Sequence, residues 1–263
     1  MRSATRFTAN LLYQHPNIIV TGECPEPLIR DFIRYRSRLE AAMRRQKHEA
    51  PWERKGPSVL RQQLIQLWLL ASPGESLDRY LPTEYTKSQY MIGHKTPWCE
   101  KFFDFYAEIF SDTGLKLIYC VRNPYDALRS SLNHPDVTPY LNAFTRSSVF
   151  RVLFYRYKRS IETALRIEKE HPTQIIFSQA DKTGPSLRER LMFAERLLDF
   201  IGEEMCPRIE ETCKEWRIAN STRQVWEKRG AKPTKTYKLT SRETNRIARD
   251  PLFAAYRKRF DYR

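Results

Sequence analysis

The stretch KLIYCVRNPYDALRS, residues 116–130, carries the clearest fold signal in the sequence. An apolar run ends at Arg122, and Pro124 then opens a helical pattern that contains Ser130. A proline suits the first turn of a helix because the N–H it lacks would have no partner there. The stretch therefore predicts a buried strand, a basic residue at its end and a helix that follows directly, which is the order of elements in an α/β fold.

Three further apolar runs are rich in β-branched residues and predict buried strands: NIIVTG (17–22), QYMIGH (89–94) and TQIIFS (173–178). Helical patterns lie between the four runs, at about 28–43, 60–67, 102–109 and 138–170, and after the last of them, at about 185–201 and 241–259. Apolar strands that alternate with helices favour a parallel sheet covered on both faces. We therefore predict an α/β fold with three layers, α/β/α, and a central parallel sheet, in a single domain over residues 1–263.

Polar residues follow each predicted strand, and these residues are Glu23, His94 with Lys95, Arg122, and Ser178 to Asp181. The carboxyl ends of parallel strands meet at one edge of a sheet, and ligands bind at that edge in open α/β folds. We therefore expect a functional site where these polar residues gather.

The chain has 46 lysines and arginines against 31 acidic residues, so its formal net charge is +15. This charge favours an anionic partner, such as an acidic polysaccharide, an anionic lipid, a nucleic acid or a phosphorylated cofactor. The five cysteines form no C-x-x-C pair, so we expect reduced thiols and no metal site. No apolar run approaches the roughly 20 residues of a membrane span and no signal peptide is visible, so we expect a cytoplasmic protein.

The N-terminal run RSATRF (Arg2–Phe7) places small and hydroxyl residues before a helical pattern with Phe7 and Leu11 on one face. The first amides of a helix have no partners within the helix, so they can cradle an anion. The run is not a Walker A loop, because the pattern G-x-x-x-x-G-K-[ST] is absent. The alternative is that Ser3 or Thr5 acts only as a helix N-cap.

Arg122 and Ser130 form a second candidate phosphate site. The guanidinium of Arg122 offers a planar fork of donors, and the hydroxyl of Ser130 adds one more. The alternative is a structural arginine held in a salt bridge and a serine without a role.

Taken together, these stretches resemble the sulfotransferases that use 3′-phosphoadenosine 5′-phosphosulfate (PAPS), in the bacterial and Golgi branch of that family. The family's 5′-phosphosulfate loop reads roughly [RK]-S-G-T-T before a helix, and RSATR is similar to it. The family's 3′-phosphate motif has an arginine at a strand end and a serine eight residues later, the separation between Arg122 and Ser130. Further similarities run to the C-terminus and comprise HPNIIVTGE, GHKTP, IIFSQADKTGP, the FIG at 200–202 and AYRKRFDYR.

The resemblance implies a P-loop NTPase-like sulfotransferase fold and transfer of a sulfuryl group from PAPS to a hydroxyl or amine, without a metal and with adenosine 3′,5′-bisphosphate as product. The implied acceptor is a glycan or a small molecule. The cofactor-binding residues that it implies are Arg2, Ser3, Ala4, Thr5, Arg6, Arg122 and Ser130. It also implies Glu23 as the general base, with His94 as the alternative base, and Arg2 and Lys95 as cations near the leaving oxygen.

Glu23 and two basic segments of the chain need separate consideration. Glu23 can instead be a surface carboxylate that pairs with Arg30 or Arg34. The basic run from Arg30 to Lys47 fits either a solvated helix face or a surface for an anionic glycan acceptor. The basic loop Trp226–Lys238 is expected to close over the cofactor, as the resemblance implies.

The chain departs from the family's pattern at its start. Ala4 and Arg6 stand where the family prefers glycine and threonine, and only Met1 precedes Arg2, where the family has a strand. We therefore expect the first strand of the family's sheet to be missing. The alternative functions are a P-loop-like phosphoryl transferase (kinase) and an inactive nucleotide-binding or nucleic-acid-binding relative. No nucleic-acid partner is expected of a sulfotransferase.

Overall fold

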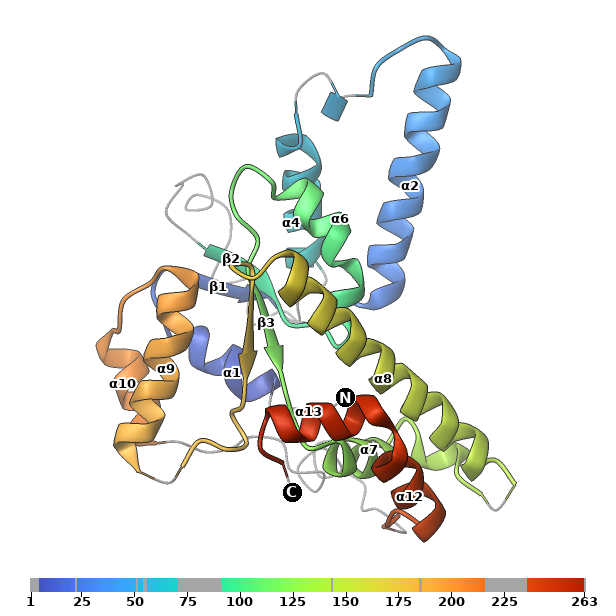
Figure 1. Ribbon diagram of the computed structural model, residues 1–263. Helices are drawn as coiled ribbons and strands as arrows, with labels where there is room; N and C mark the ends of the chain where they lie inside the picture. Colours follow the sequence, from blue (N-terminus) through green and yellow to red (C-terminus); the bar gives the residue numbers. More distant parts are fainter. Residues whose placement is uncertain are drawn as a thin grey trace. The chain divides into compact units, whose positions relative to one another are not determined.

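The computed structural model describes residues 5–21, 23–50, 52–53, 56–70, 91–142, 144–184, 186–215 and 236–262. This part of the chain is a mixed α/β structure in which helices predominate (Figure 1). The chain divides into two compact units: unit 1 comprises Met1–Thr8, Ile118–Met205 and Glu210–Arg263, and unit 2 comprises Ala9–Leu117 and Cys206–Ile209. Two such units can belong to one domain or to two, so the expected single domain stays a prediction.

The sheet of unit 2 consists of β1 (Ile18–Thr21) and β2 (Met91–His94). The two strands run parallel and are paired from their first residues to their last. Ile18 and Ile19 are buried, as expected of β-branched residues in a strand that other elements cover. The strands predicted at these two positions are confirmed over the described residues.

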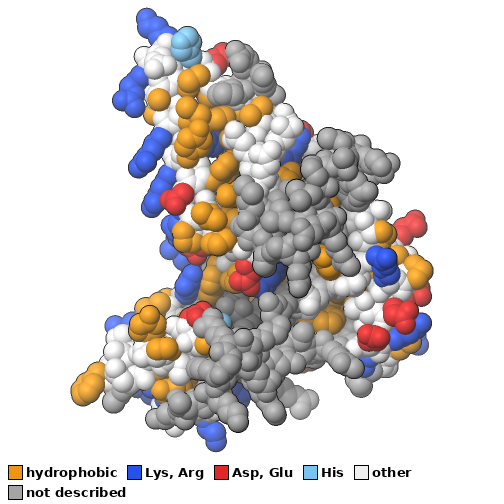
Figure 2. Space-filling model, turned by 180° about the vertical axis from the view of Figure 1, so that it is seen from behind, with side chains coloured by type: hydrophobic (Ala, Val, Ile, Leu, Met, Phe, Trp, Pro, Cys, Tyr) orange, Lys and Arg blue, Asp and Glu red, His pale blue; other side chains and the backbone are white. Residues whose placement is uncertain are grey.

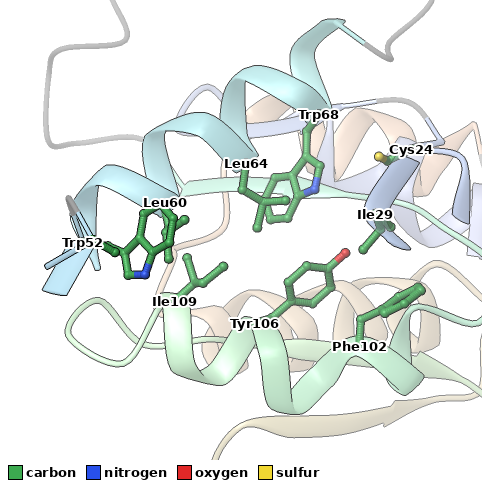
Figure 3. Packing of buried hydrophobic residues seen from close by; sticks show 10 residues of the cluster. Cys24, Ile29, Trp52, Leu60, Leu64, Trp68, Phe102, Tyr106 and Ile109 are labelled. Carbon is green, nitrogen blue, oxygen red and sulfur yellow. The ribbon is translucent and has the colours of Figure 1, made fainter. Parts of the chain in front are cut away.

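The helices of unit 2 are α2 (Glu26–Arg45), α4 (Ser58–Leu70), the short 3-10 helix η2 (Cys99–Phe102) and α6 (Phe103–Ile109). Their apolar faces meet in one core, where Ile29 from α2, Leu64 and Trp68 from α4, and Tyr106 and Ile109 from α6 point toward one another (Figure 3). Full burial of one such side chain contributes about 1.5–3 kcal/mol. The core therefore accounts for the association of these helices.

The sheet of unit 1 pairs β3 (Leu117–Cys120) with β4 (Ile175–Ser178), and the arrows of the two strands point the same way in Figure 1. The helices of this unit are α7 (Pro124–Leu132), the 3-10 helix η3 (Thr138–Tyr140), α8 (Arg146–Glu170), α9 (Leu187–Ile201), α12 (Ser241–Arg249) and α13 (Pro251–Arg259). Two more helices, α1 (Thr5–Leu12) and α10 (Pro207–Lys214), contribute residues to both units. The strands predicted from the third and fourth apolar runs are confirmed.

The helix predicted at 138–170 is wrong over its first residues, because α8 begins at Arg146. The side chain of Asn142 accepts hydrogen bonds from the backbone N–H of Phe144 and of Thr145, both at 2.9 Å. An asparagine that binds nearby backbone amides in this way competes with the helix and favours a turn. The spacing of apolar residues does not reveal this turn, because the turn depends on the hydrogen bonds of one polar side chain.

The single helix predicted at 241–259 is two helices, α12 and α13. Pro251 has no backbone N–H and its ring would clash with a carbonyl of the preceding turn, so a continuous helix is disfavoured there. The side chain of Asp250 caps the second helix by accepting hydrogen bonds from the N–H of Leu252 (3.0 Å) and of Phe253 (3.3 Å). The dipeptide Asp-Pro therefore ends one helix and starts the next.

The five cysteines are all free thiols. Burial raises the pKa of the Cys24 thiol, and likewise that of Cys213, to about 11, so both stay protonated at pH 7. Within the described part of the chain, each helix is too short or too polar to span a lipid bilayer.

Candidate functional site

The start of α1 packs against the carboxyl ends of both strands of unit 1. The Thr8 hydroxyl lies 3.5 Å from the hydroxyl of Ser178, the last residue of β4, and 3.6 Å from the sulfur of Cys120, the last residue of β3. Phe7 contributes a ring contact with Phe193 of α9, with 6.4 Å between centroids. The helix that follows the predicted phosphate loop is therefore fixed at the edge of the sheet where ligands bind in α/β folds.

The predicted phosphate loop itself is described only in part. Arg2, Ser3 and Ala4 lie outside the described residues. Thr5 and Arg6 form the first residues of α1, and their side chains also lie outside what the structure describes. The cradle of amides and hydroxyls expected there stays a prediction.

Arg122 and Ser130 stand at the two ends of α7. Pro124 is the first residue of this helix, and the side chain of Asn123 caps it by accepting a hydrogen bond from the N–H of Tyr125 at 3.1 Å. The predicted strand–arginine–helix order is thus confirmed. Ser130 is half-buried in the last turn of α7, and Arg122 is half-buried two residues beyond β3.

Arg122 lies in a polar cluster at the carboxyl edge of the unit 1 sheet. The Tyr157 hydroxyl donates a hydrogen bond to the Arg122 carbonyl oxygen at 2.9 Å. The Tyr262 hydroxyl lies 2.9 Å from one carboxylate oxygen of Asp181 and donates to it. Desolvation raises the pKa of Asp181, and the Tyr262 hydrogen bond and the charge of Arg122 oppose this shift without cancelling it. Asp181 is therefore the acidic neighbour of the proposed phosphate-binding arginine.

The C-terminal end of the late basic loop is attached to α7. Of Trp226–Lys238, the structure describes residues 236–238. The side-chain amide of Asn133, just after α7, donates to the Tyr237 carbonyl at 2.8 Å and accepts from the Tyr237 N–H at 2.8 Å. This pair of bonds holds the chain beside the end of the helix that carries Ser130. Closure of the loop over a cofactor stays a prediction.

Glu23 and Lys95 come together in unit 2, as the polar ends of neighbouring strands should. Their side chains form an ion pair in which Glu23 is 56% exposed and Lys95 is 18% exposed. Arg30 pairs instead with Glu26, at 2.8 Å, which contradicts the alternative that Arg30 is the partner of Glu23. Arg34 likewise pairs elsewhere within α2, so the same alternative is wrong for it. An exposed carboxylate beside a half-buried ammonium is chemically suited to proton transfer next to a developing anion.

Thr96 fastens the loop after β2 to the loop after β1. Its hydroxyl accepts from the N–H of Cys24 and donates to the carbonyl of Cys24, both at 3.1 Å, and it lies 2.7 Å from Nδ1 of His94. A hydroxyl has one hydrogen, so donation to Cys24 leaves the Thr96 oxygen to accept from His94 Nδ1–H. Thr96 thus ties together the two segments that present Glu23 and Lys95. No sequence pattern indicates this role of Thr96.

His94 is enclosed by aromatic rings. Its ring centroid lies 4.4 Å from that of Trp68 and 5.5 Å from that of Tyr106. Burial lowers the pKa of His94 to about 4, so the imidazole is neutral at pH 7. Because this covered ring is less accessible to an acceptor than the exposed carboxylate of Glu23, Glu23 is the better candidate base. The contact with Trp68 joins residues far apart in the chain, and no sequence pattern signals it.

One buried polar atom at this edge has no hydrogen-bond partner among the described residues. Thr21, the last residue of β1, is 2% exposed, and its hydroxyl oxygen makes no hydrogen bond there. Leaving such a group unpaired costs about 1–3 kcal/mol, so unpaired polar atoms call for a functional or structural explanation. The atom belongs to the strand that leads directly to Glu23.

Among the described residues, no three His, Cys, Asp or Glu side chains gather into a group that could hold a metal ion. Comparison of the sequence with protein-family models finds no matching family. Comparison with curated proteins finds no match either.

Proposed function

We propose that this protein transfers a sulfuryl group from PAPS to a hydroxyl or amine of an acceptor. One observation carries the proposal: the start of α1 packs on the carboxyl ends of β3 and β4, and Arg122 follows the end of β3 at the same edge. A helix start and an arginine at one sheet edge are the two features that a nucleotide with two separate phosphate groups requires. We further propose that the sheets belong to one central parallel sheet in a P-loop NTPase-like, three-layer domain.

The nucleotide would be held by the residues that the resemblance to PAPS-dependent sulfotransferases implies. The 5′-phosphosulfate would lie against the amides and hydroxyls that lead into α1, from Arg2 to Arg6. The 3′-phosphate would lie on the guanidinium of Arg122 and the hydroxyl of Ser130. This second phosphate is absent from ATP and AMP, so Arg122 would provide the selectivity for PAPS.

The reaction needs a base, a sulfur electrophile and a stabilised leaving group. The acceptor oxygen would lose its proton to Glu23 and form a bond to the sulfur, while the bond from the sulfur to the bridging oxygen breaks. The electron pair of that bond leaves with adenosine 3′,5′-bisphosphate. Protonation neutralises Glu23, so Lys95 loses its ion-pair partner and its charge becomes available to the leaving phosphate, together with that of Arg2.

Calorimetry with adenosine 3′,5′-bisphosphate and with AMP tests the nucleotide assignment. We expect the bisphosphate to bind and AMP to bind at least about tenfold more weakly, because hydrogen bonds to a charged group contribute about 1.5–3 kcal/mol. Arg122→Gln should remove most of this difference. Arg129→Gln is the matched control, since it removes an exposed arginine of the adjacent helix α7, one that pairs with Asp126. Equal binding of the two nucleotides, or binding of neither, would show that the proposed function is wrong.

A further inference from the structure

The outer face of α2 carries a row of arginines. Arg30, Arg34, Arg38 and Arg45 are exposed, and their separations of four, four and seven residues place them along one side of the helix. Figure 2 shows lysine and arginine side chains spaced along the outer edge of this part of the molecule, at the upper left. With a rise of 1.5 Å per residue, the row is about 22 Å long. We call these four residues the arginine row.

On the inner face of α2, the arginine Arg36 is largely buried and bound by two carboxylates. Arg36 is 16% exposed, and its guanidinium binds Glu40 at 2.8 Å and Glu108 of α6 at 3.0 Å. The hydrogen bonds that Arg36 donates to Glu108 and to Glu40 raise its pKa above its ordinary value. This arginine is neutralised by acidic neighbours and serves to hold α2 on the core of unit 2.

Two of the four residues of the arginine row, Arg38 and Arg45, lack such neutralisation among the described residues. Arg30 and Arg34 have carboxylate partners only within α2 itself, and the Arg34 pair is loose, with 3.3 Å between the atoms and side chains about two-thirds exposed. Arg38 and Arg45 have no carboxylate within ion-pair distance among the described residues. Exposed pairs within a helix contribute only about 0.3–0.5 kcal/mol, so an incoming anion can displace them. The row therefore presents two arginines without a carboxylate partner among the described residues, Arg38 and Arg45, and two that are paired only within α2.

The geometry suits a linear polymer with repeated anionic groups. Successive arginines at four-residue spacing lie roughly 6 Å apart, and the exposed residues beside them on that side of the helix are the small Ser37 and Ala41 and the carboxylate Asp31. The exposed Tyr35 falls outside the row, toward Leu28. Proteins that bind single-stranded nucleic acid combine basic side chains with aromatic rings on which the bases stack. A row without aromatic residues is better suited to a polysaccharide, which is bound through its charges.

We propose that the arginine row binds a linear sulfated or carboxylated polysaccharide, and that this polymer is the acceptor. The second part rests on the proposed function. Glu23 stands three residues before the start of α2 and belongs to the same unit. A polysaccharide bound along α2 would therefore bring its hydroxyl groups toward the proposed base, while its charged groups remain on the arginines.

Binding of a size-fractionated heparin oligosaccharide tests the row. The full-length protein and the variant Arg34→Gln/Arg38→Gln/Arg45→Gln are titrated by calorimetry at several salt concentrations. A second triple variant, Arg151→Gln/Arg159→Gln/Arg188→Gln, removes three exposed arginines of α8 and α9 and lowers the net charge equally. We expect the first variant to bind at least about tenfold more weakly and with a shallower salt dependence, because it gives up three ionic contacts. The control should bind like the wild type.

Three outcomes would overturn the inference. Equal losses in the two triple variants would mean that net charge, not the row, binds heparin. Unchanged binding in the first variant would mean that the polymer binds elsewhere. Equal or tighter binding of a DNA oligonucleotide through the same three arginines would identify a nucleic acid as the partner. All substitutions lie at exposed positions, and equal melting temperatures verify that the variants fold.

The same samples separate this inference from the proposed function. Both triple variants should still bind adenosine 3′,5′-bisphosphate, because Arg122 belongs to unit 1 and the row to unit 2. Heparin binding by the row without any nucleotide binding would leave the docking surface standing and refute the sulfotransferase. Nucleotide binding without heparin binding would refute the docking surface and leave the proposed sulfotransferase function standing.

Discussion

At the scale of single residues, the surroundings of His94 set its chemistry. The ring packs against Trp68, and its Nδ1 lies 2.7 Å from the Thr96 hydroxyl. A charged imidazolium would lose its hydration in this environment, so the neutral form is favoured. His94 is therefore better suited to a structural role at the end of β2 than to proton transfer at pH 7.

This arrangement predicts a pH dependence of stability. The pKa of His94 is about 4 in the folded protein and about 6.5 in the unfolded chain, so between these values the unfolded chain binds the extra proton. The free energy of unfolding should therefore fall as the pH is lowered from 6.5 to 5, with a slope from this group that steepens toward its limit of about 1.4 kcal/mol per pH unit. Urea unfolding at pH 7, 6 and 5 measures the slope.

The variant His94→Gln should flatten that slope, while His48→Gln, in an exposed segment after α2, should leave it unchanged. Carboxylates with lowered pKa values, such as Glu26 and Glu243, contribute only at lower pH and do not obscure this window. An identical slope in wild type and His94→Gln would contradict the prediction.

At the residue level, the structure confirms the expected meeting of polar side chains that follow neighbouring strands, while their catalytic roles stay predictions. Glu23 and Lys95 follow neighbouring parallel strands, and the geometry of such strands brings them together. Thr96 and Trp68 could not be found in this way. Their partners, Cys24 and His94, are distant in the chain: the pairing of β1 with β2 brings Thr96 to Cys24, and the packing of α4 brings Trp68 to His94.

At the scale of elements, the arginines of α2 differ between its two faces: Arg36 on the inner face attaches the helix to α6, and the arginines of the outer face are exposed to solvent. Its inner face packs on α6 through Phe32, whose ring centroid lies 6.1 Å from that of Phe105, and through the Arg36 ion pairs. Its outer face presents the arginine row to solvent. One helix can do both because residues three and four apart share a side, while the opposite side is free to differ.

Loss of Arg36 should weaken the attachment of α2. In Arg36→Gln, Glu40 would keep the hydrogen bond from Trp52 Nε1 at 2.9 Å and the loose ion pair with Arg44 at 3.9 Å, and Glu108 would lose its arginine. We expect the free energy of unfolding to fall by about 1–3 kcal/mol, the range for hydrogen bonds with a charged partner. Arg34→Gln, on the outer face, should change it by less than about 0.5 kcal/mol. Equal effects in urea unfolding would show that the inner pairs do not hold the helix.

Element positions followed from hydrophobic periodicity, but two helix boundaries did not. The turn at Asn142 and the break before Pro251 are decided by a side chain that binds backbone amides and by a missing N–H. Both effects are local and leave the apolar pattern nearly continuous. The apolar pattern therefore predicts one continuous helix where the structure has a turn or a helix break.

At the scale of the whole molecule, the two proposed ligands belong to different compact units. The nucleotide residues Arg122 and Ser130 lie in unit 1, and α2 with Glu23 lies in unit 2. A net charge of +15 would attract both an adenosine bisphosphate and a polyanion without regard to place. A binding constant therefore does not distinguish a specific binding site from attraction by the protein's net positive charge. The segments in which a ligand slows amide hydrogen exchange do make that distinction.

Amide hydrogen exchange with each ligand makes this distinction. Adenosine 3′,5′-bisphosphate should slow exchange at the start of α1 and across α7, because a bound ligand stabilises the segments it contacts against local opening. A heparin oligosaccharide should slow exchange along α2 and leave α7 unchanged. Each protection should disappear with its own variant, Arg122→Gln for the nucleotide and the arginine-row triple variant for heparin. Protection of the same segments by both anions would mean that they share one basic surface, and the division of labour between the units would be wrong.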